Sequence, residues 1–239
     1  MLIRLFFAAL CLSVLLPASA DQSLQAWIDT ALPGTVLRLP PGTYRGPASI
    51  TKALTLEGNG KVIVDGGGKG TVLTIKADRV TVRGVTLKGS GDSHDALDGA
   101  IMVTEGSDLL IENNVIEDVL FGISLHRTSD SIIRHNRIRS RPVDSADRGD
   151  GLRLWYSTGN RIEDNDIAQI RDITVSNSPH NRYTGNTIRD SRRAFNFLFS
   201  HRSLVDRNIL EKNSTGIIAL NSNGLIIRGN RILHAMDAA

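Results

Sequence analysis

The sequence has one cysteine in 239 residues, and this residue, Cys11, lies in the apolar N-terminal stretch. Residues 1–20 are expected to be a secretory signal peptide, because Arg4 precedes an apolar run and an Ala-Ser-Ala tripeptide ends at Ala20. Cys11 would leave with this segment, so the mature chain would have no disulfide, cysteine nucleophile or thiolate metal site. Residues 21–239 are then expected to form one periplasmic domain.

The sequence also lacks further long apolar runs and a large net charge. A membrane span takes about 20 apolar residues, so we expect no membrane insertion of the mature chain. The formal net charge of the sequence is +3, and loss of Arg4 leaves +2 (3 − 1). A charge this small and evenly spread does not indicate a nucleic-acid partner.

A repeat fills most of the chain instead. Each copy has an asparagine, an aliphatic residue two positions later and an apolar residue three positions earlier. Alternating apolar pairs such as Ile123 and Leu125 keep the same intervals, which is typical of strands. Three short strands in about 22 residues leave no room for a helix. The asparagines are Asn114, Asn136, Asn165, Asn186, Asn208 and Asn230, at intervals of 22, 29, 21, 22 and 22 residues.

This repeat predicts an all-β fold, a right-handed single-stranded parallel β-helix of about nine coils, or pectate-lyase-like solenoid. Stacked coils lie about 4.8 Å apart, so the asparagines are expected to form a buried ladder. Near the N-terminus, Leu24, Trp27, Ile28 and Ala31 follow helical spacing. They predict a short helix that caps the open end of the apolar core.

Two coils are longer than the others by about seven residues, at 89–98 and 139–150. Both insertions follow the same strand of their coils and are separated by one coil, so we expect them on one edge about 10 Å apart. They would form a rim rich in aspartate, which includes Asp150 and His94. This rim is either a working face or a set of solvated turns.

The residues after the second insertion are the candidate surface for a ligand or partner. Trp155 and Tyr156 are expected to project outward, as a platform for a sugar or a protein or as packing over the next turn. We expect Asp150, Arg171 and Arg193 to stack in one column, with Arg153 pointing outward nearby. Such a column also occurs in a salt-bridged sheet face.

Two histidines are the best metal candidates in a mature chain without thiols. His180 and His201 fall on adjacent coils in neighbouring columns of one turn, so their rings are expected within roughly 5 to 8 Å. Histidine and methionine bind copper in exported proteins, and Met102 and His94 are weaker candidates. Ordinary polar surface is the alternative for His180 and His201.

Catalysis is not expected from this sequence. Enzymes on β-helices that act on acidic polysaccharides use clustered carboxylates and a basic residue. No column of paired carboxylates occurs on successive coils here. A polysaccharide lyase or epimerase is nevertheless the alternative to a non-enzymatic role.

Several short phrases occur together in the sequence, among them LPPGTY at 39–44, LTLEG at 54–58 and RGDGLRLWYS at 148–157. They resemble the NosD family, periplasmic copper-binding proteins with β-helix repeats of the carbohydrate-binding type. The resemblance implies an accessory protein in maturation of nitrous oxide reductase. Its implied partners are an ABC transporter permease and ATPase, a copper chaperone and the reductase. A carbohydrate-binding β-helix is the alternative.

Overall fold

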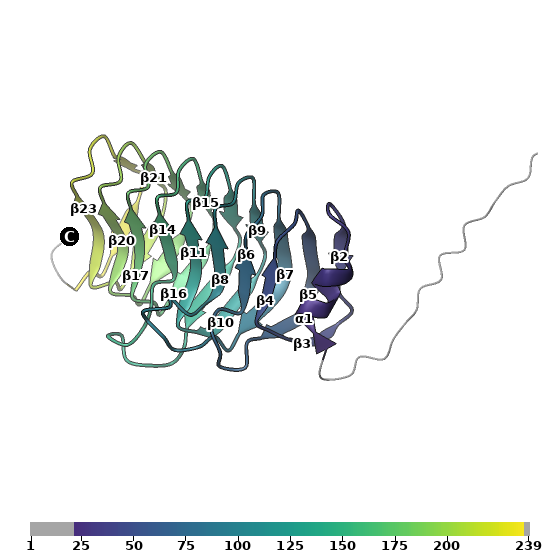
Figure 1. Ribbon diagram of the computed structural model, residues 1–239. Coiled ribbons are helices and arrows are strands. Elements are labelled where there is room, and N and C mark those ends of the chain that lie inside the picture. The colour runs from purple at the N-terminus through teal and green to yellow at the C-terminus, as the bar shows by residue number, and fades with distance from the viewer. Residues whose placement is uncertain (1–21, 237–239) are drawn as a thin grey trace, which may run out of the picture.

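The computed structural model describes residues 22–236, and the expected signal peptide at 1–20 lies outside them. Short strands wind into coils that stack along one axis, with the N-terminal and C-terminal coils at opposite ends (Figure 1). All named strand pairs are parallel, and equivalent strands pair between neighbouring coils. The predicted parallel β-helix is therefore confirmed.

Eight strands form a continuous sheet that faces the viewer in Figure 1, and we call it the front sheet. Each inner strand of this sheet pairs with the strands of the coils before and after it, and the register shifts once, between β17 and β20. Its strands are β4 (Ala48–Ile50), β6 (Leu73–Ile75), β8 (Gly99–Thr104), β11 (Phe121–His126), β14 (Leu152–Trp155), β17 (Asp172–Ser176), β20 (Arg193–Leu198) and β23 (Thr215–Leu220).

The other strands form two further columns, which the long strands β5 (Thr55–Asp65) and β7 (Thr81–Lys88) join into one sheet. Besides these two, one column holds β2 (Val36–Arg38), β9 (Leu110–Glu112), β12 (Ile132–Arg134), β15 (Arg161–Glu163), β18 (Arg182–Thr184), β21 (Leu204–Asp206) and β24 (Ile226–Arg228). The second column holds β1 (Gln22–Ser23), β3 (Gly42–Arg45), β10 (Val115–Val119), β13 (Arg137–Ser140), β16 (Asp166–Ala168), β19 (Thr187–Arg189), β22 (Ile209–Glu211) and β25 (Arg231–Leu233).

The core is a stack of inward apolar side chains, one layer for each coil. Ile111, Ile133, Ile162, Tyr183 and Val205 occupy equivalent positions and are at most 1% exposed. Burial of a side chain of this size contributes roughly 1.5–3 kcal/mol. The apolar alternation that predicted strands in the sequence is therefore the inner lining of the coils.

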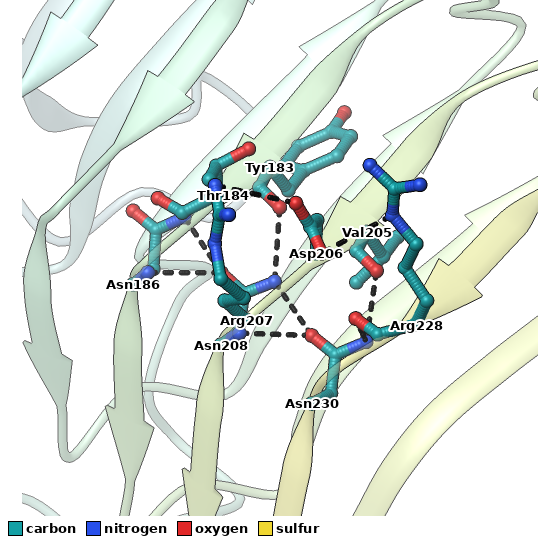
Figure 2. A network of polar contacts seen from close by, with 9 residues as sticks. All are labelled: Tyr183, Thr184, Asn186, Val205, Asp206, Arg207, Asn208, Arg228 and Asn230. Carbon is teal, nitrogen blue, oxygen red and sulfur yellow. Dashed lines mark hydrogen bonds and ion pairs between the residues drawn. The ribbon is translucent and has the colours of Figure 1, made fainter.

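The six asparagines form the predicted ladder at the corner between the two joined columns. Asn136 donates from its backbone N–H and from Nδ2 to Oδ1 of Asn165, both at 3.0 Å. Asn165 repeats both bonds to Asn186, and the ladder continues through Asn208 to Asn230 (Figure 2). Strands β5 and β7 run through this corner because their coils precede Asn114, the first asparagine of the ladder.

A second ladder, which we did not predict, lies at the corner after the front sheet. The backbone N–H of Ser131 donates to Oδ1 of Asn160, Asn160 donates to Asn181, and the N–H of Asn181 donates to Ser203. Its members are two asparagines, Asn160 and Asn181, with a serine on either side. A search for recurring asparagines alone therefore does not detect it.

The outer face of the column from β2 to β24 carries charges of alternating sign. Register pairs place Arg38, Glu57, Arg83, Glu112, Arg134, Glu163, Thr184, Asp206 and Arg228 in one line. Ion pairs join Glu57 to Arg38 and Arg83, Arg134 to Glu112, and Arg228 to Asp206. Figure 2 shows the end of this line, where Thr184 takes the place of a cation.

Helix α1 (Leu24–Thr30) caps the N-terminal end of the core, as its spacing predicted. Leu24 and Ile28 are buried, and Trp27 packs edge-on against Tyr44 at 6.2 Å between ring centroids. Gln25 ties the helix to the first coil, because Oε1 accepts from the N–H of Ser49 at 2.7 Å. The cap therefore both covers apolar surface and satisfies a backbone donor.

Candidate functional site

The outward face of the front sheet carries two rows of side chains. One row reads Met102, Ser124, Arg153, Thr174, Asn196 and Ile218, and the next reads Thr104, His126, Trp155, Ser176, Leu198 and Leu220. Most members are small or polar. Arg153 and Trp155 of β14 are therefore the large side chains that stand out from the middle of this face.

The two aromatic residues of β14 and its turn are exposed, as predicted. Trp155 is 37% and Tyr156 is 54% exposed, and their rings meet edge-on at 5.4 Å between centroids. The Arg153 guanidinium lies 5.6 Å from the centre of the Trp155 ring, within the range of a cation–π contact. Their arrangement presents an apolar platform with a positive charge on its inner side.

Asp150 does not lie on an exposed rim, because its side chain is only 1% exposed. Its Oδ1 accepts a hydrogen bond from Nε of Arg171 at 3.2 Å, and Nη1 of Arg153 lies 3.6 Å from Oδ2. Burial raises the pKa of Asp150, and the charge of Arg171 and a hydrogen bond from Thr174 oppose that rise. This carboxylate is therefore part of an internal ion-pair network under the second insertion.

The expected stack of Asp150, Arg171 and Arg193 is wrong for Arg193. A register shift between Asp172 and Thr174 makes Arg193 the partner of Asp172. Asp172 is buried and binds Arg192 through two hydrogen bonds, with Arg193 3.6 Å away. A one-residue bulge of this kind shifts side chains by one column. The repeat interval shows the added residue, as 22 after 21, but not its position within the coil.

The two insertions lie on one edge, as predicted, and they touch. Nη2 of Arg141 donates to the backbone oxygens of Ser90 and Gly91, both at 2.9 Å. The acidic rim is less exposed than expected, because Asp98 is also buried and Oδ2 accepts from the N–H of Ser93. His94 lies edge-on against Phe121 at 5.7 Å.

His126 is a site residue that the sequence did not single out. It shares a hollow of about 210 Å³ with Thr104, Arg127 and Trp155. Burial lowers the pKa of His126, and the charges of Arg153 and Arg127 lower it further. Its Nε2 is buried and has no hydrogen-bond partner. The position of Trp155 in the repeat was the available signal, because His126 pairs with it on the preceding coil.

The two candidate metal ligands lie together on one turn. His180 and His201 line a depression of about 430 Å³ with Arg202. Nδ1 of His201 accepts a hydrogen bond from the N–H of Asn223 at 2.9 Å, which leaves Nε2 as its ligand atom. Within residues 22–236 no group of three or more His, Cys, Asp or Glu side chains is arranged to hold a metal.

The other two metal candidates lie elsewhere. Met102 lies on the outer face of β8. His94, which belongs to the first insertion, packs on Phe121 of β11. The described residues therefore offer a pair of imidazoles on one turn, without thioether support from Met102.

A larger hollow lies where the second insertion reaches the corners of later coils. It has a volume of about 840 Å³, and Ser145 of the insertion lies on its rim. The sequence did not predict it, because the direction in which a long loop folds is not contained in the repeat. Its other lining residues are Asp190, Ser191, Arg192, Lys212, Ser214, His234 and Met236.

Stacked parallel coils, a buried asparagine ladder and insertions on one edge define a parallel β-helix protein. The family model described as "Right handed beta helix region" matches residues 70–232, more than half of the chain. The chain belongs to this family, which confirms the predicted handedness.

Two curated relatives are similar to this chain. The protein from Pseudomonas aeruginosa is 32% identical over 136 residues, and the protein from Stutzerimonas stutzeri is 31% identical over 137 residues. Both bear the name "Probable ABC transporter binding protein NosD". The matches cover 56% of this chain but only 32% and 31% of the relatives. The chain is therefore a NosD-like β-helix protein that matches about a third of these relatives' length.

Solved structures share the fold. An alginate lyase from Paenibacillus sp. str. FPU-7 superposes with a TM-score of 0.56 at 14% identity, covering 90% of this chain and 96% of the lyase. The A-module of mannuronan C-5 epimerase AlgE4 from Azotobacter vinelandii gives 0.57 at 17% identity, covering 92% and 77%. Identities this low show the β-helix alone.

In the described range, 22–236, no helix is long and apolar enough to cross a membrane.

Proposed function

We propose that this chain is a periplasmic accessory protein of an ABC transporter system and that it assists assembly of the copper site of nitrous oxide reductase. The observation that carries the proposal is the 31–32% identity to the two NosD proteins over 56% of the chain. The name of these two proteins, ABC transporter binding protein, supports an ABC transporter as a partner. The copper chaperone and the reductase enter by resemblance to the same family.

The chemistry of the front sheet supports binding rather than catalysis. Asp150 and Asp172 are the buried carboxylates beside the exposed aromatic platform, and each is engaged by arginines. Arginines paired with a carboxylate compete with a substrate proton or a metal ion for its negative charge, which disfavours a role as general base or metal ligand. This arrangement favours a docking scaffold over the alternative of a lyase or epimerase.

The transporter role is tested by co-purification. The mature chain, residues 21–239, would carry an affinity tag and be produced together with the ABC transporter permease and ATPase. Recovery of the complex in a fixed ratio supports the proposal. Recovery no greater than with an unrelated tagged β-helix protein contradicts it.

His180 and His201 are the residues that would hold copper. Two imidazole nitrogens on one turn suit Cu(I), which accepts few ligands and binds histidine. Bound copper would be cargo for delivery, and the exposed turn would leave it open to a partner. In this role the two rings capture the ion, and the backbone bond from Asn223 orients His201.

The copper step is tested by an anaerobic Cu(I) titration against a competing chelator. We expect His180→Ala and His201→Ala each to weaken binding by about tenfold or more, since a lost ligand or its supporting bond typically weakens affinity by this much. His135→Ala is the control matched to His180, because both histidines are exposed and both have a positive φ. Equal affinity in all four proteins would refute this site.

The main rival is a carbohydrate-binding β-helix. The exposed Trp155 and Tyr156 pair favours it, because aromatic faces stack on sugar rings. A titration of the mature chain with alginate, followed by Trp155 fluorescence, separates the two functions. Saturable quenching that is lost in Trp155→Ala would support the rival.

A further inference from the structure

An apolar strip runs along the edge of the front sheet towards the C-terminal coils. Trp155, Leu198 and Leu220 share one row, and Tyr156 and Phe199 follow Trp155 and Leu198 directly in the chain. Four of these five side chains are 37–54% exposed, and Leu198 is partly exposed. We call these five residues the apolar strip. Ser176 and Asn177 of the intervening coil separate Trp155 and Tyr156 from Leu198 and Phe199. Exposed apolar groups gathered along one edge in this way mark interaction surfaces.

Two residues of the strip have an unfavourable backbone conformation. Tyr156 has a φ of 49° and Phe199 a φ of 50°, in the left-handed region. The equivalent residues of neighbouring coils are Asn177 and Asn221, each with a φ of 49°. Asparagine tolerates this region, whereas bulky residues are rare there. Aromatic residues at these positions therefore lower stability while exposing apolar surface, a combination typical of functional sites.

The charge around the strip indicates the kind of partner segment that would bind there. The three strand-and-turn segments that carry it, 153–160, 196–203 and 218–225, and the segment 174–181 between them contain no Asp or Glu. They contain Arg153 and Arg202, together with the imidazoles of His180 and His201. A partner segment with carboxylates beside its apolar residues would match this charge. A second copy of the chain would bring arginine to arginine.

The aliphatic members of the strip favour a protein partner over a glycan. Sugars stack on aromatic faces, but Leu198 and Leu220 offer no such face. A polypeptide buries leucine and aromatic side chains alike. Tyr156 and Phe199 lie two coils apart, about 10 Å, which apolar residues of one peptide segment can span.

We propose that the apolar strip docks an acidic amphipathic segment of a protein partner. This inference rests on the proposed function in so far as the partner belongs to the ABC transporter system. The partner's apolar side chains would cover Trp155, Tyr156 and Phe199, and its carboxylates would face Arg153 and Arg202.

Photocrosslinking tests the inference in cells that produce the full chain and the transporter. p-Benzoylphenylalanine replaces Phe199, or Leu32 as the control, because Leu32 is apolar and 75% exposed at the opposite end. We expect a protein adduct at position 199, absent at position 32, that maps to an acidic amphipathic segment. No adduct, an adduct with a second copy or a glycan, or an adduct in a non-acidic segment overturns the inference.

Binding to a synthetic peptide of the crosslinked segment then tests the strained positions. The double variant Tyr156→Asn, Phe199→Asn should weaken binding by about tenfold or more, as loss of central aromatic anchors does. Its Tm should stay equal or rise, because asparagine suits a positive φ. Unchanged binding, or a lower Tm, contradicts the inference.

The two proposals fail separately. If the adduct maps to an acidic segment of a protein outside the transporter system, the docking strip stands and the transporter role fails. If the double variant still co-purifies with the transporter in full yield, the transporter role stands and the docking strip fails.

Discussion

Asn165 lies in the middle of the asparagine ladder, so its removal tests what the ladder contributes. Asn165→Ala leaves two buried donors of Asn136, the backbone N–H and Nδ2, without the oxygen that accepts both. It also removes the donor to the carbonyl of Ile133 at 2.9 Å. The oxygen of Asn186 keeps the bond from the backbone N–H of residue 165. A buried unsatisfied group costs about 1–3 kcal/mol, so we expect a loss of about 4 kcal/mol for the two donors.

Equilibrium urea unfolding of the mature chain, followed by circular dichroism, measures this loss. Asn230→Ala is the matched control in the same ladder. Its bonds from Asn208 lie at the partly exposed end of the ladder, where water can replace them. We therefore expect a loss of only about 1 kcal/mol for the control. Equal losses for the two variants, or less than about 1 kcal/mol for Asn165→Ala, would refute a structural ladder.

Four other predictions follow from particular contacts. Tyr183→Phe removes a buried hydroxyl without a partner, so urea unfolding should show a gain of about 1 kcal/mol. Thr184→Arg restores the alternating charge line and should add about 0.5 kcal/mol, a gain that high salt abolishes. Gly122→Ala places a Cβ against the carbonyl oxygen of Gly151 and should cost about 3 kcal/mol, whereas Gly216→Ala faces only flexible Ile232 side-chain atoms and should cost far less. Asp166→Asn should lower stability at neutral pH, with a difference from the parent that disappears in melts at low pH.

The hydrogen-bond partners of Asp166 determine the direction of its pKa shift, and therefore how its contribution to stability depends on pH. Burial alone would raise the pKa of Asp166, but hydrogen bonds from Arg189 and Arg139 outweigh burial and hold the pKa below its usual value. A carboxyl group whose pKa is lowered in the folded state stabilises the protein at pH values above its pKa in the unfolded chain, about 3.9 for aspartate. That contribution is lost as the pH falls through the folded pKa. Asparagine has no such dependence, so a difference that persists at low pH would contradict this account.

The sequence predicted the β-helix well because both sequence signals come from one cause. The stacking of similar coils produces the regular repeat interval and also places the apolar residues inward. Side chains at equivalent positions stack, so Asn114 to Asn230 had to meet once the coil length was known. The capping helix followed from its own apolar spacing and was confirmed. Both features depend on interactions between equivalent positions or between residues close in the chain.

The candidate site was predicted less completely, because its details depend on local irregularities. The shift at Asp172 moves Arg193 out of the expected column, and the fold of the second insertion buries Asp150. The exposure of Trp155 and Tyr156 was predicted correctly, since it follows from strand alternation. The roles of His180 and His201 stay predictions, which the copper titration addresses.

The line of alternating charges from Arg38 to Arg228 has a consequence for how the chain folds. The inward residues of successive coils are nearly interchangeable, so a strand that pairs one coil too early would still bury isoleucine on isoleucine. On the outer face the same slip would bring Glu112 beside Glu163 or Arg83 beside Arg134. Like charges directly opposite each other destabilise a sheet. The charged face thus disfavours pairing of strands that are one coil out of register, a mispairing that the apolar core alone would not prevent.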